Sequence, residues 1–218
     1  MKKNNYLIIM FGKNESINID NAIYMSKLRS NFIYIDSSSS DGTQDLLKKN
    51  KIKFINHTYK NWKELRQEGY SYAKENNFKW ILMLDADEIV NNKTLDYLDK
   101  LDKKNYDSYS INFNMIFCGK KLNYLSHRPR IRFYSVDRTY PKGDTILDFI
   151  DSKRNKELPK KYSILNNDKK DYISLIKKQV EKVDHSLVEI HRDINEHSKF
   201  KKLVLRVLGR NLILKSIF

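Results

Sequence analysis

The sequence WILMLDADE, residues 80–88, joins five successive apolar residues directly to a group of three carboxylates. A continuous apolar run of this length is typical of a strand buried on both faces of a sheet. The carboxylates of Asp85, Asp87 and Glu88 repel one another and lose solvation at such a strand end. A cation among them would offset this cost in free energy. The pattern therefore indicates a hard divalent ion, Mg²⁺ or Mn²⁺. The alternative interpretation is a helix start, where acidic side chains favour the helix dipole.

Apolar runs of the same kind precede this stretch and alternate with helical patterns. The runs cover residues 6–11, 32–35 and 52–55, and the helical patterns cover 17–28, the turn-flanked segment around 46–47, and 62–76. This alternation predicts an α/β fold with a mainly parallel sheet flanked by helices. In such a sheet ligands bind at the carboxyl ends of the strands. Because Asp36 ends the second run as Asp85 ends the fourth, we expect both at one edge.

The segment after Asp36 is built of small polar residues. It reads SSSSDGT over residues 37–43, so a ligand can approach its backbone closely, with Ser38 as a candidate contact. The carboxylate of Asp36 can accept a hydrogen bond from the N3–H of uracil or from a ribose hydroxyl. The last three residues, 41–43, supply turn and helix-cap chemistry. The alternative is that the whole segment only caps the following helix.

The composition limits the class of protein. A chain of 218 residues is enough for one ordinary domain with a core, or for one domain plus a short appendage, and 40% hydrophobic residues argue against global disorder. The single cysteine, Cys118, excludes a disulfide framework within the chain. Forty-two Lys and Arg against 27 Asp and Glu give a net charge of +15. This charge favours polyanionic partners, although the lysines are spread along the whole chain as in a compositional bias.

The sequence shows no membrane-spanning or secretory signal. The apolar run at residues 6–11 is too short for a signal peptide, and the polar residues 12–15 follow it without a cleavage site. No stretch approaches the roughly 20 apolar residues that span a bilayer. We expect a cytoplasmic protein, either soluble or peripheral at the inner face of the membrane.

The pattern changes after about residue 105. Residues 109–117 and 131–134 read as strands. Arg130 and Arg132 lie on one strand face as candidates to neutralise a diphosphate or an anionic acceptor, and the alternative is an ordinary solvated strand face. Residues 137–170 are polar and irregular, and no element is assigned there. From residue 199 apolar and basic side chains lie on opposite faces of a helical pattern. That helix packs on the domain or lies on an anionic membrane surface.

Three motifs together resemble those of the family 2 glycosyltransferases of GT-A fold. They are Asn14-Glu15 after the first apolar run, residues 35–43 (IDSSSSDGT) and residues 80–88. Their order and spacing are most similar to the branch related to lipopolysaccharide core β-glucosyltransferases, and the resemblance covers about residues 5–135. It implies residues 1–175 as a catalytic domain, with a nucleotide-binding half to about residue 105 and an acceptor half at 106–175. Residues 176–218 would form a basic helical extension.

The resemblance also implies roles for individual residues. Asp36 would contact the nucleotide base, Asp85 would lie near the ribose and the metal, and Asp87 would bind the metal directly. The segment from Phe11 to Glu15 would wall the base pocket. The implied donor-site contacts are Phe11, Asn14, Glu15, Asp36, Ser38, Arg66, Asp85 and Ala86.

The general base is the weakest point of the resemblance. The branch carries a His-Glu pair after an Arg-Leu-Phe-Arg strand, whereas this chain has Arg130-Ile-Arg-Phe-Tyr134 with no His-Glu after it. A carboxylate must still take the proton of the acceptor hydroxyl. Asp148 is the first candidate, then Asp144 and Glu88, and for each the alternative is an ordinary surface acid.

The metal shell has a further candidate ligand in the C-terminal part. Enzymes of this fold often complete the shell with a histidine, which His185 would supply. The alternative is a solvent-exposed histidine on a basic helix.

These features predict a metal-dependent, inverting enzyme of hexosyltransferase type. It would move a sugar from a UDP-sugar to a hydroxyl of a glycan or a lipid-linked acceptor, in cell-surface polysaccharide or lipopolysaccharide synthesis. One alternative is a catalytically degenerate scaffold of the same fold. A nucleic-acid-binding module is a weaker alternative, because no recognised motif supports it, and no nucleic-acid partner is expected.

Overall fold

The computed structural model describes residues 6–117, 120–122, 129–142 and 149–170. All of these except Lys170 belong to one compact unit that runs from residue 1 to residue 169. The helices are α1 (Ile19–Leu28), α2 (Thr43–Lys49), α3 (Trp62–Glu75) and α4 (Asn92–Asp99), with a 3₁₀ turn at Ser16–Asn18. The strands are β1 (Tyr6–Gly12), β2 (Phe32–Asp36), β3 (Phe54–Asn56), β4 (Trp80–Asp85), β5 (Glu88–Ile89), β6 (Ser108–Phe117), β7 (Lys120–Leu122), β8 (Arg130–Ser135), β9 (Tyr140–Lys142), β10 (Phe149–Asp151), β11 (Asn155–Glu157) and β12 (Ser163–Asn166).

The first half of the chain forms the predicted parallel sheet. Its strands lie in the order β3-β2-β1-β4, and the neighbours are parallel. All seven residues of β1 are buried, as the continuous apolar run predicts for a central strand. The register pairs Gly12 of β1 with Asp36 and Phe11 with Asp85. The two acidic strand ends therefore flank the end of β1 at one edge, as expected.

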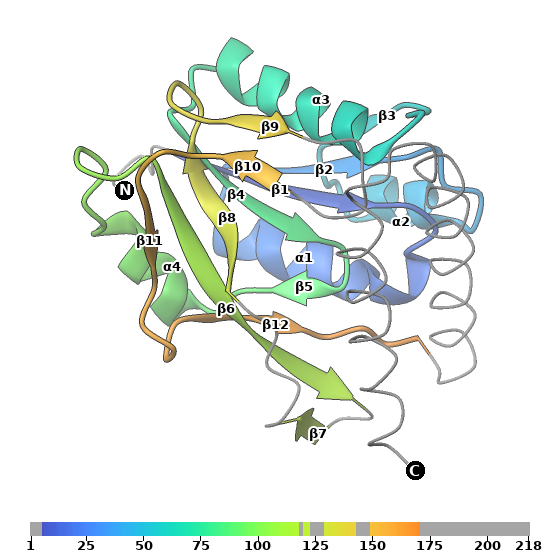
Figure 1. Cartoon of the computed structure of the whole chain (residues 1–218). Helices are drawn as coiled ribbons and strands as arrows, with labels where there is room; N and C mark the ends of the chain where they lie inside the picture. Colours follow the sequence, from blue (N-terminus) through green and yellow to red (C-terminus); the bar gives the residue numbers. More distant parts are fainter. Residues whose placement is uncertain (1–5, 118–119, 123–128, 143–148, 171–218) are drawn as a thin grey trace, which may run out of the picture. The chain divides into compact units, whose positions relative to one another are not determined.

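Helices cover both faces of this sheet (Figure 1). Alternate residues of β1, Ile8 and Met10, pack in one core cluster with side chains of α1, α2 and α4. Leu7 and Ile9 pack in a second cluster that includes side chains of α3. Gly69 lets α3 approach closely, because a Cβ there would lie 3.0 Å from side-chain carbons of both Ile9 and Phe11. The predicted α/β class, with a parallel sheet flanked by helices, is confirmed.

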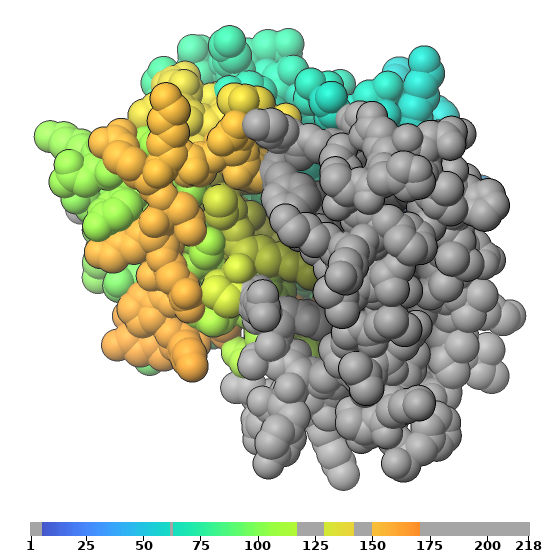
Figure 2. All heavy atoms as spheres, in the orientation of Figure 1, coloured from blue at the N-terminus to red at the C-terminus, as the bar shows by residue number. Residues whose placement is uncertain are grey.

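The second half continues the sheet in mixed directions. β8 runs antiparallel to β4, β6 runs antiparallel to β8, and β12 runs parallel to β6 and antiparallel to β5. Among the described residues ten strands form one sheet, and β9 and β10 form a separate hairpin. This hairpin lies beside α3 on the surface in Figure 2.

Residues 137–170, left without an assigned element from sequence, contain β9 to β12. These strands have three or four residues each, which is too short to show a periodic pattern. The predicted C-terminal helix lies outside the described residues. Within those residues, no helix is both long and apolar enough to cross a membrane.

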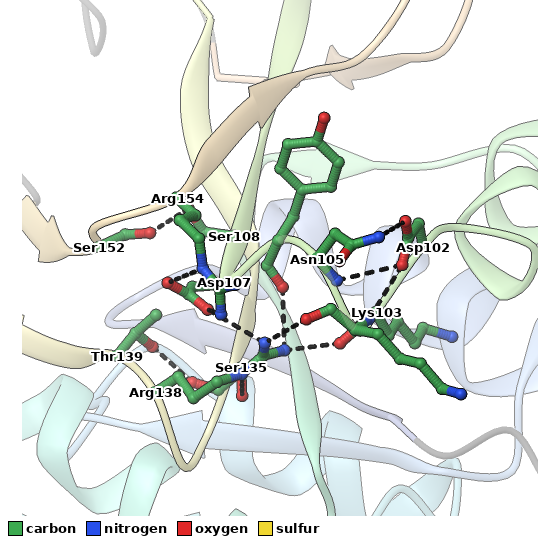
Figure 3. A network of polar contacts seen from close by, with 12 residues as sticks. Asp102, Lys103, Asn105, Asp107, Ser108, Ser135, Arg138, Thr139, Ser152 and Arg154 are labelled. Atoms are coloured by element: carbon green, nitrogen blue, oxygen red, sulfur yellow. Dashed lines mark hydrogen bonds and ion pairs between the residues drawn. The ribbon is translucent and has the colours of Figure 1, made fainter.

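A polar network joins the second half to the parallel sheet at the edge opposite the acidic strand ends (Figure 3). Asp107, buried directly before β6, accepts hydrogen bonds from Arg154 at 2.9 and 3.3 Å and forms an ion pair with Arg138 at 3.1 Å. Arg138 also donates to three backbone carbonyls between residues 103 and 106, and its guanidinium lies 5.7 Å from the ring centre of Trp80. This network fixes the connection between α4 and β6.

Replacing the Asp107 carboxylate should destabilise the fold. Asp107→Asn keeps the shape but removes a charged acceptor, and hydrogen bonds to charged groups typically contribute about 2 kcal/mol each. We expect a loss of about 2 kcal/mol in the free energy of unfolding by urea titration. Asp137→Asn is the matched control, because Asp137 is exposed and lies 3.4 Å from the exposed Lys79. It should change stability by less than about 0.5 kcal/mol.

The stability lost in Asp107→Asn should depend on pH. Hydrogen bonds from Arg154 lower the pKa of Asp107 below its ordinary value. The stability that this carboxylate supplies is therefore present above the unfolded pKa of about 4 and is lost as the pH falls through the lower folded pKa. The stability gap between the original protein and Asp107→Asn should close on acidification. A gap that stays constant down to pH 2 to 3 would contradict this account.

Candidate donor and metal site

The centre of the site is the tight turn between β4 and β5. Asp85 ends β4 and Glu88 begins β5, and the Asp85 backbone N–H donates to Glu88 Oε2 at 2.9 Å. Ala86 is buried, and its N–H donates to the carbonyl of Phe11 at 2.8 Å. Helix α4 begins only at residue 92, with Asn91 as its cap. The helix-start interpretation of the acidic group is therefore wrong.

The turn brings the three predicted carboxylates together. One oxygen from each of Asp85, Asp87 and Glu88 lies within 4.8 Å of the others. Carboxylate oxygens at such spacing are the hard ligands that Mg²⁺ and Mn²⁺ prefer. The donor set thus fits a divalent cation.

Two buried arginines face Asp85. Arg132 from β8 is 1% exposed, and its Nη2 lies 2.9 Å from Asp85 Oδ2 and 2.9 Å from Glu88 Oε1. Arg66 from α3 is 6% exposed, and its Nη2 lies 3.7 Å from Asp85 Oδ1. The Arg66 guanidinium lies 5.4 Å from the ring centre of Phe11. The structure thus brings the predicted contacts Phe11, Arg66 and Asp85 together.

Glu88 is the most deeply buried acid of the turn. Its carboxylate is 4% exposed, and its two oxygens accept hydrogen bonds from Arg132 and from the backbone of Asp85. Burial raises the pKa of Glu88 well above its ordinary value, against the lowering effect of the Arg132 charge; the nearby Asp85 and Asp87 charges raise it further. A carboxylate in this position holds the turn, and both of its oxygens already accept hydrogen bonds.

The loop after β2 is ordered by Asp36. This side chain is fully buried, and its oxygens accept hydrogen bonds from the Ser39 backbone N–H at 2.9 Å, the Ser39 hydroxyl at 2.5 Å and the Gln44 amide at 2.9 Å. Ser38 has a φ of 51° and hydrogen-bonds the Thr58 hydroxyl at 2.8 Å. Asp36 therefore shapes the loop that the sequence assigns to the nucleotide. Its contact with the base stays a prediction.

The predicted Asn14-Glu15 motif binds this same loop. Asn14, with a φ of 55°, donates its N–H to Ser39 Oγ and accepts the Ser40 N–H on its side-chain oxygen, both at 2.8 Å. The Glu15 N–H donates to Thr43 Oγ1 at 3.0 Å, and its side chain is buried. The loops after β1 and β2 therefore form one hydrogen-bonded unit at the carboxyl edge of the sheet.

A close packing contact requires Gly12 at the base of this unit. A Cβ on Gly12 would lie 1.9 Å from the Tyr34 hydroxyl and 3.0 Å from the Cβ of Ala86. Burial raises the pKa of Tyr34 well above its ordinary value, and the nearby acids, Glu15 first among them, add to this effect. The two loops and the acidic turn thus meet above one buried tyrosine.

Asparagines that the sequence analysis missed hold the acidic turn from the side of α1. The Asn21 amide is 3% exposed and donates to the Ala86 carbonyl at 3.0 Å. Asn167, just after β12, donates its N–H to the Asp87 carbonyl at 2.6 Å and its amide to Asn21 Oδ1 at 3.3 Å. The only signal in the sequence is a polar residue on the apolar face of α1. Its partner lies 146 positions away, so spacing alone could not reveal the contact.

Three predicted site residues fall outside the described part of the chain. They are the base candidates Asp144 and Asp148 and the proposed metal ligand His185. Their roles stay predictions. Arg130 and Arg132 do share a strand face, since both guanidiniums lie over the ring of Phe113, at 5.8 and 5.3 Å from its centre.

A parallel sheet with loops and an acidic turn at its carboxyl edge is the arrangement of a nucleotide-binding α/β domain of GT-A type. The sequence model described as glycosyl transferase family 2 matches residues 13–154. This match covers more than half of the chain and includes both loops and the acidic turn. The chain therefore belongs to glycosyl transferase family 2. No curated protein matches the sequence significantly.

One solved structure supports the fold at low sequence identity, and two others show a weaker similarity. TarS of S. aureus is similar over 75% of this chain and 36% of its own, with 15% identity and a TM-score of 0.55. A glucosyl-3-phosphoglycerate synthase from Mycobacterium tuberculosis, in complex with Mn²⁺, UDP and glucosyl-3-phosphoglycerate, matches over 54% and 45% of the two chains, with 14% identity and a TM-score of 0.40. A cytidylyltransferase from Leptospira borgpetersenii matches over 61% of each, with 14% identity and a TM-score of 0.40. The chain thus spans about a third of the length of TarS and less than two thirds of the other two.

The hydrogen bond from Asn21 to the Ala86 carbonyl should contribute measurably to the free energy of unfolding. Asn21→Ala removes the donor to the Ala86 carbonyl and leaves buried polar groups without it, which costs about 1–3 kcal/mol. Asn50→Ala is the matched control, because the exposed Asn50 amide also donates to a backbone carbonyl, that of Leu46, at 2.8 Å. We expect the control to lose less than about 0.5 kcal/mol in the same urea titration. Equal losses in the two variants would contradict a special role for Asn21.

Proposed function

We propose that the protein transfers a sugar from a UDP-sugar to a hydroxyl group of a glycan or lipid-linked acceptor, with inversion at the anomeric carbon. The acidic turn carries this proposal. Its three carboxylate oxygens lie within 4.8 Å of one another, and Asp85 pairs in register with Phe11 of β1, next to the loops that the family uses for the nucleotide. Membership of family 2 is consistent with a nucleotide-sugar donor.

The residues of the turn have separate tasks in this proposal. Asp87 would hold Mn²⁺ or Mg²⁺ directly, with Asp85 beside it. When bound, the ion would neutralise charge that grows on the diphosphate leaving group. Asp36 and the loop it orders would bind the base and ribose, and Arg66 would face the donor.

The chemistry requires one bond to form and one to break. The acceptor oxygen attacks the anomeric carbon of the sugar, the bond from that carbon to the diphosphate oxygen breaks, and the acceptor proton passes to a general base. Asp148 is the first candidate for this base and Asp144 the second. Glu88 is a poor choice, because both of its oxygens already accept hydrogen bonds in a buried position. We propose a positioning role for it.

The biological setting follows from the resemblance and from the charge. We propose a hexosyltransferase in cell-surface polysaccharide or lipopolysaccharide synthesis that acts in the cytoplasm. A net charge of +15 would favour an anionic donor and a peripheral contact with an anionic membrane at its inner face.

Binding of the nucleotide tests the proposal directly. A ligand that binds only the folded state at 100 times its Kd adds about 2.7 kcal/mol of stability, which raises the Tm of a chain of this size by about 5–10 °C. We expect UDP to raise the Tm in this way with Mn²⁺ present and to act far more weakly with EDTA. Asp87→Ala should abolish the Mn²⁺-dependent part of the shift and the transfer of sugar.

A matched control separates the site from general charge effects. Asp45→Ala also removes one carboxylate, from an exposed position on α2. It should leave the UDP shift unchanged within about 1 °C, because a surface pair of this kind contributes little. Absence of a shift with UDP, GDP or CMP and their sugar conjugates would overturn the proposal and favour a non-catalytic scaffold.

A further inference from the structure

Arg132 pairs with two of the three carboxylates that could hold a metal ion. A single nitrogen, Nη2, donates to both Asp85 Oδ2 and Glu88 Oε1 at 2.9 Å. These two carboxylates are members of the group whose oxygens could hold a cation. A cation bound through these two oxygens would compete with the arginine hydrogen bonds, and a cation bound through the other oxygens would still lie beside a like charge.

The position of Arg132 is fixed from several sides. The residue is 1% exposed on β8, between its neighbours β4 and β6, and its guanidinium lies 5.3 Å from the ring centre of Phe113. A buried guanidinium is stable only where acids pair with it, and its planar fork keeps its direction. Moving the Arg132 side chain away from the turn would therefore cost free energy.

We propose that Arg132 keeps Asp85 and Glu88 from binding a bare divalent cation tightly, so that the turn takes up the metal together with the donor diphosphate. Arg132 is thus a positioning residue that sets how metal and nucleotide depend on each other. The inference rests on the proposed function, since it concerns the cation that this function requires. This role predicts that removing the Arg132 charge strengthens Mn²⁺ binding, whereas a purely structural role predicts that it weakens Mn²⁺ binding.

The test is a calorimetric titration of Mn²⁺ alone into the nucleotide-free protein. Arg132→Met keeps the length and apolar stem of the side chain against Phe113 but removes the charge. Because Arg132→Met frees two carboxylate oxygens and removes one positive charge, we expect the affinity for Mn²⁺ to rise about tenfold or more. If Arg132 only held the shape of the turn, the same variant would bind Mn²⁺ more weakly. An unchanged or weaker affinity overturns the inference.

A matched control tests whether the effect is local. Arg130→Met removes the same charge from the same strand face, where Arg130 is exposed and lies over the same Phe113 ring. We expect its Mn²⁺ affinity to stay within about twofold of the original, because solvent screens an exposed charge. An equal rise in both variants would mean a general charge effect and would overturn the inference.

A double variant tests the inference if Arg132→Met alone does not fold. Glu88→Gln removes the buried acid, so adding Arg132→Met to it leaves no unpaired Glu88 charge in the interior. The double variant should still bind Mn²⁺ about tenfold more tightly than Glu88→Gln alone, because Asp85 is released. Equal affinities of these two proteins would contradict the inference.

The coupling to the nucleotide gives a second readout. In the original protein UDP should strengthen Mn²⁺ binding, and in Arg132→Met this gain should shrink about tenfold, since the bare cation is already held. The outcomes separate the two proposals. If the original protein binds neither Mn²⁺ nor UDP, the proposed function fails; if it binds both and Arg132→Met behaves like Arg130→Met, only the inference fails.

Discussion

The site depends on the pairing of a carboxylate-rich turn with buried arginines. Three acids gathered at the end of β4 would repel one another, and each loses water on burial. Arg132 from β8 and Arg66 from α3 lie nearest to different oxygens of Asp85, and the backbone of Asp85 adds a hydrogen bond to Glu88. The fold is therefore arranged so that a helix of the first half and a strand of the second half meet at the same acid.

The sequence was enough to predict the parallel half of the fold and the edge at which its acidic strand ends lie. Buried apolar runs mark β1, β2 and β4 directly, and a carboxylate at the end of a run implies the sheet edge without any contact information. The acids Asp85, Asp87 and Glu88 lie close together because neighbours along the chain stay neighbours in a tight turn, and their roles stay predictions. The same reasoning placed Asp36 at the correct edge of the sheet.

The contacts that the sequence could not provide are those between distant segments. Arg132 lies 47 positions from Asp85 and Asn167 lies 146 from Asn21, and neither pair leaves a periodic trace. The short strands β9 to β12 form because β6 and the rest of the second half supply partners, so local preference could not reveal them. The full burial of Asp36 was also unexpected. A loop of serines looks open in sequence, yet Ser39 and Gln44 fold back onto that carboxylate.

The charge of the site differs in sign from the charge of the chain, and the difference has a physical consequence. When all three acids of the turn are ionised, two guanidiniums leave one negative charge among these five side chains. One divalent cation reverses that sign, and only then is the turn attractive to a diphosphate. The basic surface, at a net charge of +15, attracts anions at long range whether or not a metal is present. In the proposed function, long-range attraction and final capture would therefore rest on different groups, and the arginines would make capture depend on the metal and the nucleotide together.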